Sequence, residues 1–399
     1  MRKWIIGAAV LAVAVPLTFK LVEPVLVHGS GWAALPASIP VTSSYVQNAK
    51  WLQAANRARA ALLAGREVLQ APALSVAVSH SGELVWRGVV GHADLEAVTP
   101  ATFETQFRIG STSKAVTAVA VGTLIDQGRL KLDAPIQTYV PAYPKQEWPV
   151  TISQVMSHRA GIRDYGLCLC FPVWEHLNRR HFETVAAEVG LVASSPLLFR
   201  PGTDFGYTSL GYNLVGAAVE GASSQRFGDY LESAVFKPLG MRRTMLDSTK
   251  PIMNPPPFYE VQGGQYKRAF AVDNSIRWPS GGILSTPSDM VKLGNAMLDD
   301  RLLTPQTRRL LITVPAGGGG SAGARMYALG WRHSAWSLHG GELKVDSYHH
   351  NGTAVGSTSV LVVLPQYDIT VSVMMNKGTE NIDGLAAVTD RILEAFIPS

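Results

Sequence analysis

Hydrophobic residues follow two different periods in the N-terminal part of this chain. From Trp51 to Leu69, apolar side chains recur every three or four positions, a spacing typical of a helix with one buried face. Two apolar runs follow, Ala73–Val78 and Leu84–Val90, separated by a short turn that contains Ser81 and Gly82. Strand-like runs on either side of such a turn predict a β-hairpin.

The C-terminal part repeats this combination. The runs Thr358–Leu364 and Ile369–Met375 flank a turn at Pro365–Asp368, and a helical pattern extends from about Ile382 to Phe396. Between the two ends, residues 115–270 show helical patterns broken by Pro and Gly. We therefore predict an α/β fold in which both ends of the chain build one antiparallel β-sheet flanked by helices. The middle region, about 115–270, would be an inserted, mainly helical subdomain.

The N-terminus has the pattern of an export signal. Arg2 and Lys3 precede an apolar run, Trp4–Phe19, which is a positive segment followed by an apolar core. The run is shorter than the ~20 residues that comfortably span a bilayer, so a cleaved signal peptide and an uncleaved anchor both remain open. Either alternative predicts an exported protein, periplasmic and, if residues 4–19 are retained, anchored to the inner membrane.

This pattern divides the chain into three parts. Residues 1–22 would be the signal peptide or membrane anchor. Residues 23–48, rich in Pro, Gly and small side chains, would be a tether. Residues 49–399 would form the folded domain, which is long enough for a substantial buried core.

Composition and charge exclude several classes of protein. Hydrophobic residues make up 47% of the chain and charged residues 16%, as in a globular protein. The net charge is +5, and no run of Lys and Arg is long enough to bind nucleic acid. The only cysteines, Cys168 and Cys170, are one residue apart, which suits neither a disulfide nor a zinc ribbon. The histidines also lack a metal-ligand spacing, so neither a metal nor a cofactor is expected.

The strongest candidate for chemistry is the S-x-x-K pattern formed by Ser111 and Lys114. The residues after Lys114 are apolar on all sides up to about Gly128, as in a helix buried in a core. Ser111 would lie in the first turn, where free backbone N–H groups stabilise negative charge. Lys114 would lie on the same face, and removal of its amine from water favours the neutral form that can act as a base. The alternative interpretation is a helix-capping serine beside a solvated lysine.

Two further segments add polar groups of the same kind. Tyr207 stands where a Gly-containing turn meets a second apolar helix, a position that favours a side chain facing a cleft. The segment His349–Thr353 offers an imidazole and a Gly-lined edge for a substrate, just before the strand expected from about Thr358. His158 is interpreted as a hydrogen-bonded residue at a helix end rather than as a catalyst.

In this order, the three elements resemble the S-x-x-K, Y-x-N/S and K/H-x-G signatures of the class C β-lactamase and penicillin-binding-protein superfamily. Further segments extend the match, and together they most resemble the serine β-lactamase-like LACTB group. The resemblance covers nearly all of the chain from Trp51 onward, and it implies a serine β-lactamase/DD-peptidase-like fold. The additional matching segments are Leu130–Pro135, Ser157–Arg163, Asp273–Ser275 and Gly281–Thr286.

The resemblance also implies roles for individual residues. Ser111 would be the nucleophile that forms an acyl-enzyme, and Lys114 and Tyr207 would share the proton relay. The superfamily leaves open which of these two is the principal base. The backbone N–H groups of Ser111 and Thr353 would form the oxyanion hole, in which one donor is commonly worth ~3 kcal/mol of barrier.

The substrate would contact Ser209, His350, Asn351 and Gly352. Two of these positions depart from the pattern of true β-lactamases. His350 replaces a lysine, and with an unperturbed pKa near ~6.5 we expect it to become a cation for anionic substrates only as the pH falls towards that value. Ser209 replaces an amide side chain. Both changes favour peptidase or esterase chemistry over efficient β-lactam hydrolysis.

The sequence therefore predicts an exported serine hydrolase, with a LACTB-like peptidase or amidohydrolase as the leading hypothesis. It would act on a peptide, amide or ester substrate without nucleic acid. An esterase, or a weak β-lactamase or D-Ala-D-Ala carboxypeptidase, is the first alternative. The second alternative is a non-catalytic relative that binds the cell wall or a partner protein.

Overall fold

The computed structural model of this chain describes residues 31–36, 42–166, 174–177, 180–247, 257–317, 319–379 and 381–397. The export segment expected at residues 1–22 and both cysteines, Cys168 and Cys170, lie outside the described residues. Within the part of the chain that the structure describes, no helix combines the length and the apolar character needed to cross a bilayer.

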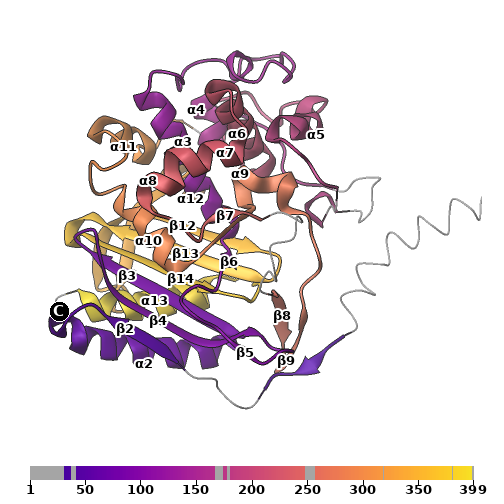
Figure 1. The fold of residues 1–399 in the computed structure, drawn as a ribbon. Helices are drawn as coiled ribbons and strands as arrows, with labels where there is room; N and C mark the ends of the chain where they lie inside the picture. Colours follow the sequence, from indigo (N-terminus) through magenta and orange to yellow (C-terminus); the bar gives the residue numbers. More distant parts are fainter. Residues whose placement is uncertain are drawn as a thin grey trace, which may run out of the picture.

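A large antiparallel sheet forms the centre of the molecule (Figure 1). Along its main path the strand order is β11-β12-β13-β14-β3-β4-β2. The N-terminal hairpin and the C-terminal hairpin meet where β14 pairs with β3, with Ile369 opposite His80 and Met375 opposite Leu74. The prediction of one sheet built from both ends of the chain is confirmed. The strands are β2 (Ser43–Val46), β3 (Ala73–His80), β4 (Glu83–Asp94), β11 (Arg332–Leu338), β12 (Leu343–Ala354), β13 (Ser357–Leu364) and β14 (Ile369–Met375).

Three of these strands were not expected from the sequence: β2, which lies within the segment 23–48 expected to be a tether, β11 and β12. The segment His349–Thr353 precedes β13, as expected, but it also lies inside β12, which pairs with β11 on one side and β13 on the other. β11 and β12 are rich in polar residues, unlike β13, which is buried along its whole length. Their polar composition obscures the apolar pattern from which strands are recognised.

Two helices from opposite ends of the chain cover one face of the sheet (Figure 1). These are α2 (Leu52–Leu69) and α13 (Asp383–Phe396), which lie within one residue of the predicted bounds. They pack closely: a Cβ on Gly65 of α2 would lie 2.5 Å from a methyl carbon of Val388 on α13. The apolar residues between these helices and the sheet form one hydrophobic core.

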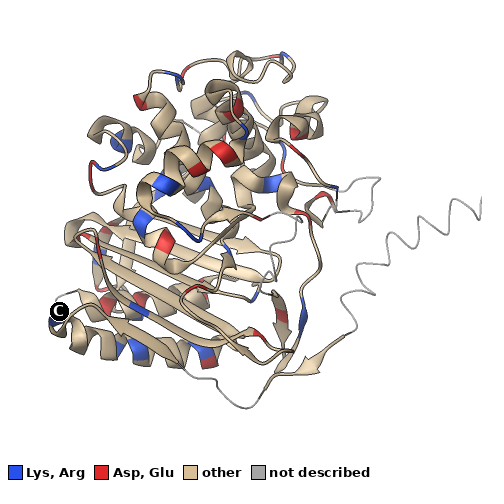
Figure 2. Cartoon of the chain, viewed as in Figure 1, with Lys and Arg blue, Asp and Glu red and all other residues tan. Residues whose placement is uncertain are grey.

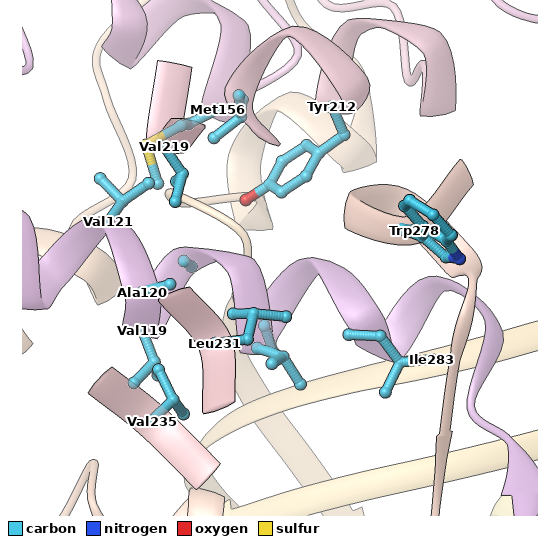
Figure 3. Packing of buried hydrophobic residues seen from close by; sticks show 14 of the residues in the cluster. Val119, Ala120, Val121, Met156, Tyr212, Val219, Leu231, Val235, Trp278 and Ile283 are labelled. Atoms are coloured by element: carbon cyan, nitrogen blue, oxygen red, sulfur yellow. The ribbon is translucent and has the colours of Figure 1, made fainter. Parts of the chain in front are cut away.

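A helical layer with a second core covers the opposite face. Its central helix is α3 (Ser113–Asp126), in which every residue from Ser113 to Leu124 is buried. Figure 3 shows Val119, Ala120 and Val121 of this helix among side chains from several surrounding helices. The other helices are α4 (Ile152–Met156), α5 (Gly190–Ala193), α6 (Ser209–Ser223), α7 (Phe227–Leu231), α8 (Lys237–Leu239), α9 (Trp278–Gly281), α10 (Pro287–Asn295), α11 (Pro305–Ile312) and α12 (Ala322–Met326).

The helical layer therefore extends past residue 270, where the sequence pattern placed its end. Short strands form two further sheets, in which β10 pairs with β6 and β7, and β9 pairs with β1 and β8. Basic and acidic residues are interspersed over both layers (Figure 2). The short strands are β1 (Ala33–Ala34), β5 (Thr99–Pro100), β6 (Phe107–Arg108), β7 (Met245–Leu246), β8 (Tyr259–Gln262), β9 (Gln265–Arg268) and β10 (Ile283–Ser285).

Candidate active site

Ser111 and Lys114 meet at the start of the central helix. Ser111 lies in a short 3₁₀ turn, η2 (Gly110–Thr112), that leads directly into α3. Lys114 Nζ lies 3.2 Å from Ser111 Oγ. Ser111 is partly exposed, whereas Lys114 is completely buried. A reachable hydroxyl thus contacts an amine that has been removed from water.

The amine of Lys114 has two other polar partners. It donates to the backbone oxygen of Ser280 at 2.9 Å and lies 3.2 Å from Ser209 Oγ. None of these partners is a carboxylate, so none of them fixes the amine as a cation. Lys114 Nζ can donate to all three oxygens, and once it has given up one proton its lone pair can instead accept the proton of Ser111. Sequence reasoning missed Ser280, because a backbone carbonyl leaves no signature in the residue type.

Tyr207 lies beside this amine, with its ring centroid 4.7 Å from Lys114 Nζ. The residue is partly exposed and stands just before α6, whose N-cap is Thr208. The Thr208 hydroxyl accepts a hydrogen bond from the Gly211 N–H at 3.0 Å. Tyr207 therefore occupies the expected junction between a turn and a helix, beside the amine of Lys114.

His158 holds the backbone on both sides of Tyr207. Its carbonyl oxygen accepts from Gly206 N at 2.9 Å, and its Nδ1 accepts from Thr208 N at 3.2 Å. The two rings also pack with centroids 4.2 Å apart. His158 follows the end of α4, as predicted, and has a φ of 60°, a left-handed conformation that is uncommon for residues other than glycine.

The His158 ring is neutral. Burial, reinforced by the charge of Lys114, lowers its pKa well below 6.5. Because Nδ1 accepts a hydrogen bond, the ring proton lies on Nε2, which is buried without a hydrogen-bond partner among the described residues. A buried residue with a strained backbone and an unsatisfied donor destabilises a protein. The three contacts that His158 makes with the Tyr207 region give the physical reason for its conformation.

His350 lies close to this group but does not present a free nitrogen. The residue is only 1% exposed. Nδ1 lies 2.6 Å from the Asn351 carbonyl oxygen, which can only accept, so Nδ1 carries the proton. Nε2 therefore accepts from Tyr327 Oη at 3.0 Å.

The charge expected on His350 is not supported by this environment. Burial, together with the charges of Arg332 and Lys114, lowers its pKa well below 6.5. The ring consequently stays neutral at the pH where the sequence predicted a cation. The reason is tertiary: an imidazole that is buried beside two positive side chains is protonated only with difficulty.

Tyr327, which sequence reasoning missed, links the two predicted motifs. Its hydroxyl bonds to His350, and its ring centroid lies 5.7 Å from that of Tyr207. Burial, followed by the proximity of Tyr207 and Tyr212, raises the pKa of Tyr327 well above 10, so its hydroxyl remains a neutral donor. Tyr327 is far from all three motifs in sequence, and its position there carries no signal of this role.

The end of β12 packs directly against the turn that carries Ser111. A Cβ on Gly352 would lie 2.9 Å from Ser111 N and only 1.8 Å from the Ile109 oxygen. A Cβ on Gly110 would lie 2.8 Å from Thr353 N. Glycine at both positions allows the two backbones to approach, which brings the amides of Ser111 and Thr353 to adjoining stretches of chain. An oxyanion hole requires two N–H donors that lie close together.

The other predicted substrate contacts divide between two places. Ser209, the first residue of α6, contacts Lys114 through its hydroxyl, and its N–H donates to Asp164 Oδ1 at 2.9 Å. Asn351 instead lines a pocket of about 260 Å³ next to β11 and α13. Elsewhere in the described part of the chain, His333 bonds to Asp346, and no cluster of His, Cys, Asp and Glu could hold a metal.

Comparison with known proteins gives a consistent result. The family model described as Beta-lactamase matches residues 59–395. Serine beta-lactamase-like protein LACTB, mitochondrial, from Homo sapiens is 30% identical over 386 residues, covering 75% of this chain and 70% of that protein. Esterase EstB from Burkholderia gladioli is 32% identical over 196 residues, covering 46% of this chain and 50% of the esterase.

Solved structures share the fold at lower sequence identity. D-amino acid amidase from Ochrobactrum anthropi SV3, complexed with L-phenylalanine, superposes with a TM-score of 0.71 at 22% identity, covering 85% of this chain and 98% of the amidase. A penicillin binding protein from Bacillus halodurans gives a TM-score of 0.67 at 24% identity, covering 82% and 98% of the respective chains. Identities this low support the fold alone.

Proposed function

This chain belongs to the beta-lactamase family, and from that premise we propose that it is a serine hydrolase in which Ser111 forms an acyl-enzyme with amide, peptide or ester substrates. One observation carries the proposal: the buried amine of Lys114 lies 3.2 Å from the partly exposed hydroxyl of Ser111 and has no carboxylate among its hydrogen-bond partners. An activated serine needs an uncharged base at this distance.

The reaction would begin with attack of Ser111 Oγ on the substrate carbonyl carbon. As the new C–O bond forms, the serine proton would pass to the amine of Lys114, which must be unprotonated at this step. The carbonyl oxygen becomes an oxyanion, and the N–H groups of Ser111 and Thr353 would stabilise it. Removal of one such donor typically slows an enzyme by about 10²- to 10³-fold.

Collapse of this intermediate needs a proton for the leaving group. Tyr207 would donate its hydroxyl proton to the departing nitrogen or oxygen while the scissile bond breaks, and the Lys114 ammonium would return a proton to Tyr207. A water molecule then attacks the acyl-enzyme by the same route in reverse, which releases the acid and restores Ser111. The packing of Tyr207 against both Lys114 and His158 supports this role.

Amide and peptide bonds are the leading substrate class, with esters second. The similarity to LACTB extends over most of the chain, and the D-amino acid amidase shares the fold. The similarity to the esterase supports the second candidate, although it covers a shorter region. Efficient β-lactam hydrolysis is not favoured, because Ser209 provides no amide side chain at its position.

A fluorophosphonate probe tests the nucleophile. The wild-type protein should be labelled at Ser111, and Ser111→Ala should not be labelled, because only an activated serine reacts readily. Lys114→Met fills the same buried volume without a base and should reduce labelling by at least about 100-fold while the protein stays folded. Wild-type labelling of Ser111→Ala would contradict the assignment. An unlabelled but folded wild type would favour a non-catalytic, binding role. Chromogenic peptides, esters and nitrocefin would then rank the substrates.

We also propose export of the folded domain, on the basis of the positive and apolar residues at the N-terminus. The full-length protein should fractionate with the cell envelope and be open to protease added outside the inner membrane. N-terminal sequencing of the mature protein distinguishes a cleaved signal from a retained anchor. A cytosolic, protease-protected protein would rule the proposal out.

A further inference from the structure

Arg108 forms a largely buried ion pair at the end of β6, three residues before Ser111. Nε lies 2.7 Å from Asp247 Oδ2, and both side chains are only 11% exposed. The guanidinium also lies 4.3 Å from the centroid of the Phe258 ring. A carboxylate on one edge and an aromatic ring on one face together fix the orientation of this side chain.

Asp247 is itself held by its backbone and by its carboxylate. It follows β7, and its N–H donates to the Gly282 oxygen at 2.9 Å. Its carbonyl oxygen accepts from Trp278 Nε1 at 3.0 Å, and Oδ2 accepts from the side-chain amide of Asn274 as well as from Arg108. A carboxylate held in this way is a firm support for the guanidinium.

The outer end of the guanidinium reaches the turn that follows β12. Nη1 donates to the backbone oxygen of Val355 at 2.9 Å. Val355 lies two residues beyond Thr353, whose N–H is the second proposed oxyanion donor. Arg108 therefore connects the segment that carries one proposed donor, Ser111, to the segment that carries the other.

Two hydroxyl groups of β13 support the same region from the sheet. Ser357 Oγ donates to the Arg108 oxygen at 2.9 Å, and Ser359 Oγ donates to the Ile109 oxygen at 2.7 Å. These bonds fix the backbone before Ser111 against β13, the strand beyond the turn. The bond from Arg108 to Val355 acts instead on the turn that ends β12, so it bears on the separation of the two proposed donors.

We propose that Arg108 is a positioning residue of the oxyanion hole: by binding the Val355 oxygen, it sets the separation of the Ser111 and Thr353 N–H groups. The assignment rests on the proposed function, since it gives this separation a role in stabilising the oxyanion. A guanidinium suits the task, because one rigid planar group donates to the carboxylate through Nε and to the carbonyl through Nη1.

An ester and its thionoester with the same phenol leaving group test the positioning. Sulfur accepts hydrogen bonds weakly, so the ratio of kcat/KM for ester over thionoester measures how well the N–H groups fit the developing anion. For Arg108→Gln, this ratio should fall at least about tenfold. The kcat/KM for the ester should fall by about 100-fold, as when an oxyanion donor is lost. Arg108→Lys should recover part of both losses, because it keeps the charge beside Asp247.

A neutral pair of substitutions separates positioning from stability. Arg108→Gln alone leaves Asp247 as a buried carboxylate without its cation, which destabilises the folded protein. Arg108→Gln combined with Asp247→Asn removes both charges, so its melting temperature should be closer to that of the wild type while its ester-to-thionoester ratio stays low. Recovery of the ratio together with the melting temperature would overturn the proposal, since Arg108 would then act only through stability.

Arg57→Gln is the matched control. Arg57 Nη2 donates to the Ala395 oxygen at 2.7 Å, so this guanidinium also joins two distant segments, but it does so between α2 and α13. Its ester-to-thionoester ratio should equal that of the wild type. A wild-type ratio in folded Arg108→Gln would overturn the proposal, whether hydrolysis of both esters is retained or equally reduced. A wild-type protein that hydrolyses neither ester and is not labelled by the fluorophosphonate would instead refute the proposed function, so the two failures can be told apart.

Discussion

Among single residues, His158 has the clearest consequence for chemistry without taking part in it. It bonds to the amides that flank Tyr207 and packs against the tyrosine ring. A small displacement of a proton donor is costly, because proton transfer depends steeply on geometry. The residue type also matters: a side chain with an acceptor near the backbone is required, in a left-handed conformation.

We expect His158→Ala to lower kcat by about 100-fold with KM changed less than about twofold. Asn can adopt the same φ, and its side-chain oxygen can replace Nδ1 as acceptor for Thr208 N, so His158→Asn should recover part of the loss. Fluorophosphonate labelling should persist in both variants, because it depends on Ser111 and Lys114. If His158→Ala turns over substrate as fast as the wild type, the residue does not position Tyr207.

For His350, the prediction concerns the stability of the protein rather than its catalytic rate. His350→Lys would place a cation in a site that is 1% exposed, near Lys114 and Arg332. An unpaired buried charge destabilises a protein by about 3–5 kcal/mol, so the melting temperature should fall by about 5 °C or more. His350→Gln stays neutral, can accept from Tyr327, and should melt closer to the wild type. A His350→Lys variant that is stable and gains nitrocefin activity relative to ester activity would contradict this prediction.

For the secondary structure elements, the contact between β12 and the η2 turn is the critical one. The two backbones touch because Gly110 and Gly352 have no side chain. Every group of the candidate oxyanion hole lies on one of these two elements, so their separation sets its geometry. The helix α3 in turn fixes η2, because it is buried on all sides and cannot shift without disturbing the core.

Gly352→Ala should therefore reduce activity by at least about 100-fold, comparable to the loss of an oxyanion donor. The new Cβ would lie 1.8 Å from the Ile109 oxygen, a backbone atom that cannot move aside cheaply. Gly190→Ala on α5 is the control, since no atom lies within 4 Å of its Cβ position, and it should leave activity and melting temperature equal or slightly raised. Retention of full activity by Gly352→Ala would show that this close approach is not needed.

At the scale of the whole molecule, one sheet is packed between two cores, and the α2–α13 layer must stay attached for the sheet to keep its shape. Asp390 of α13 contributes to this attachment by accepting a hydrogen bond from Trp336 Nε1 of β11 at 2.8 Å. Burial raises the pKa of Asp390 to about 6. The folded protein therefore holds this proton more tightly than the unfolded chain does.

This shift predicts a pH effect on the melting temperature. Below pH 3.8 the Asp390 contribution is fully present, and it is lost as the pH rises through about 6, because the folded state must then bury a charge. Asp390→Asn keeps the acceptor for Trp336 and cannot ionise. The melting temperature of the variant minus that of the wild type should increase between pH 4 and pH 7. A difference that stays constant over this range would contradict the shifted pKa.

The sequence by itself determined the parts that depend on local periodicity and spacing. The helix Leu52–Leu69, the hairpin of β3 and β4 and the helix Asp383–Phe396 follow from residues that are neighbours in the chain. The placement of Lys114 one helical turn from Ser111 also follows from spacing, since three positions along a helix lie on the same face.

Tertiary structure alone decided the environment of those residues. Ser280 and Ser209, which contact the Lys114 amine, lie more than 90 positions away in the chain. Tyr327 hydrogen-bonds to His350, and its ring packs near that of Tyr207. Burial beside the charges of Arg332 and Lys114 made His350 neutral. Charge state and hydrogen-bond partners depend on which distant segments exclude water from a side chain, and a one-dimensional pattern does not contain that information.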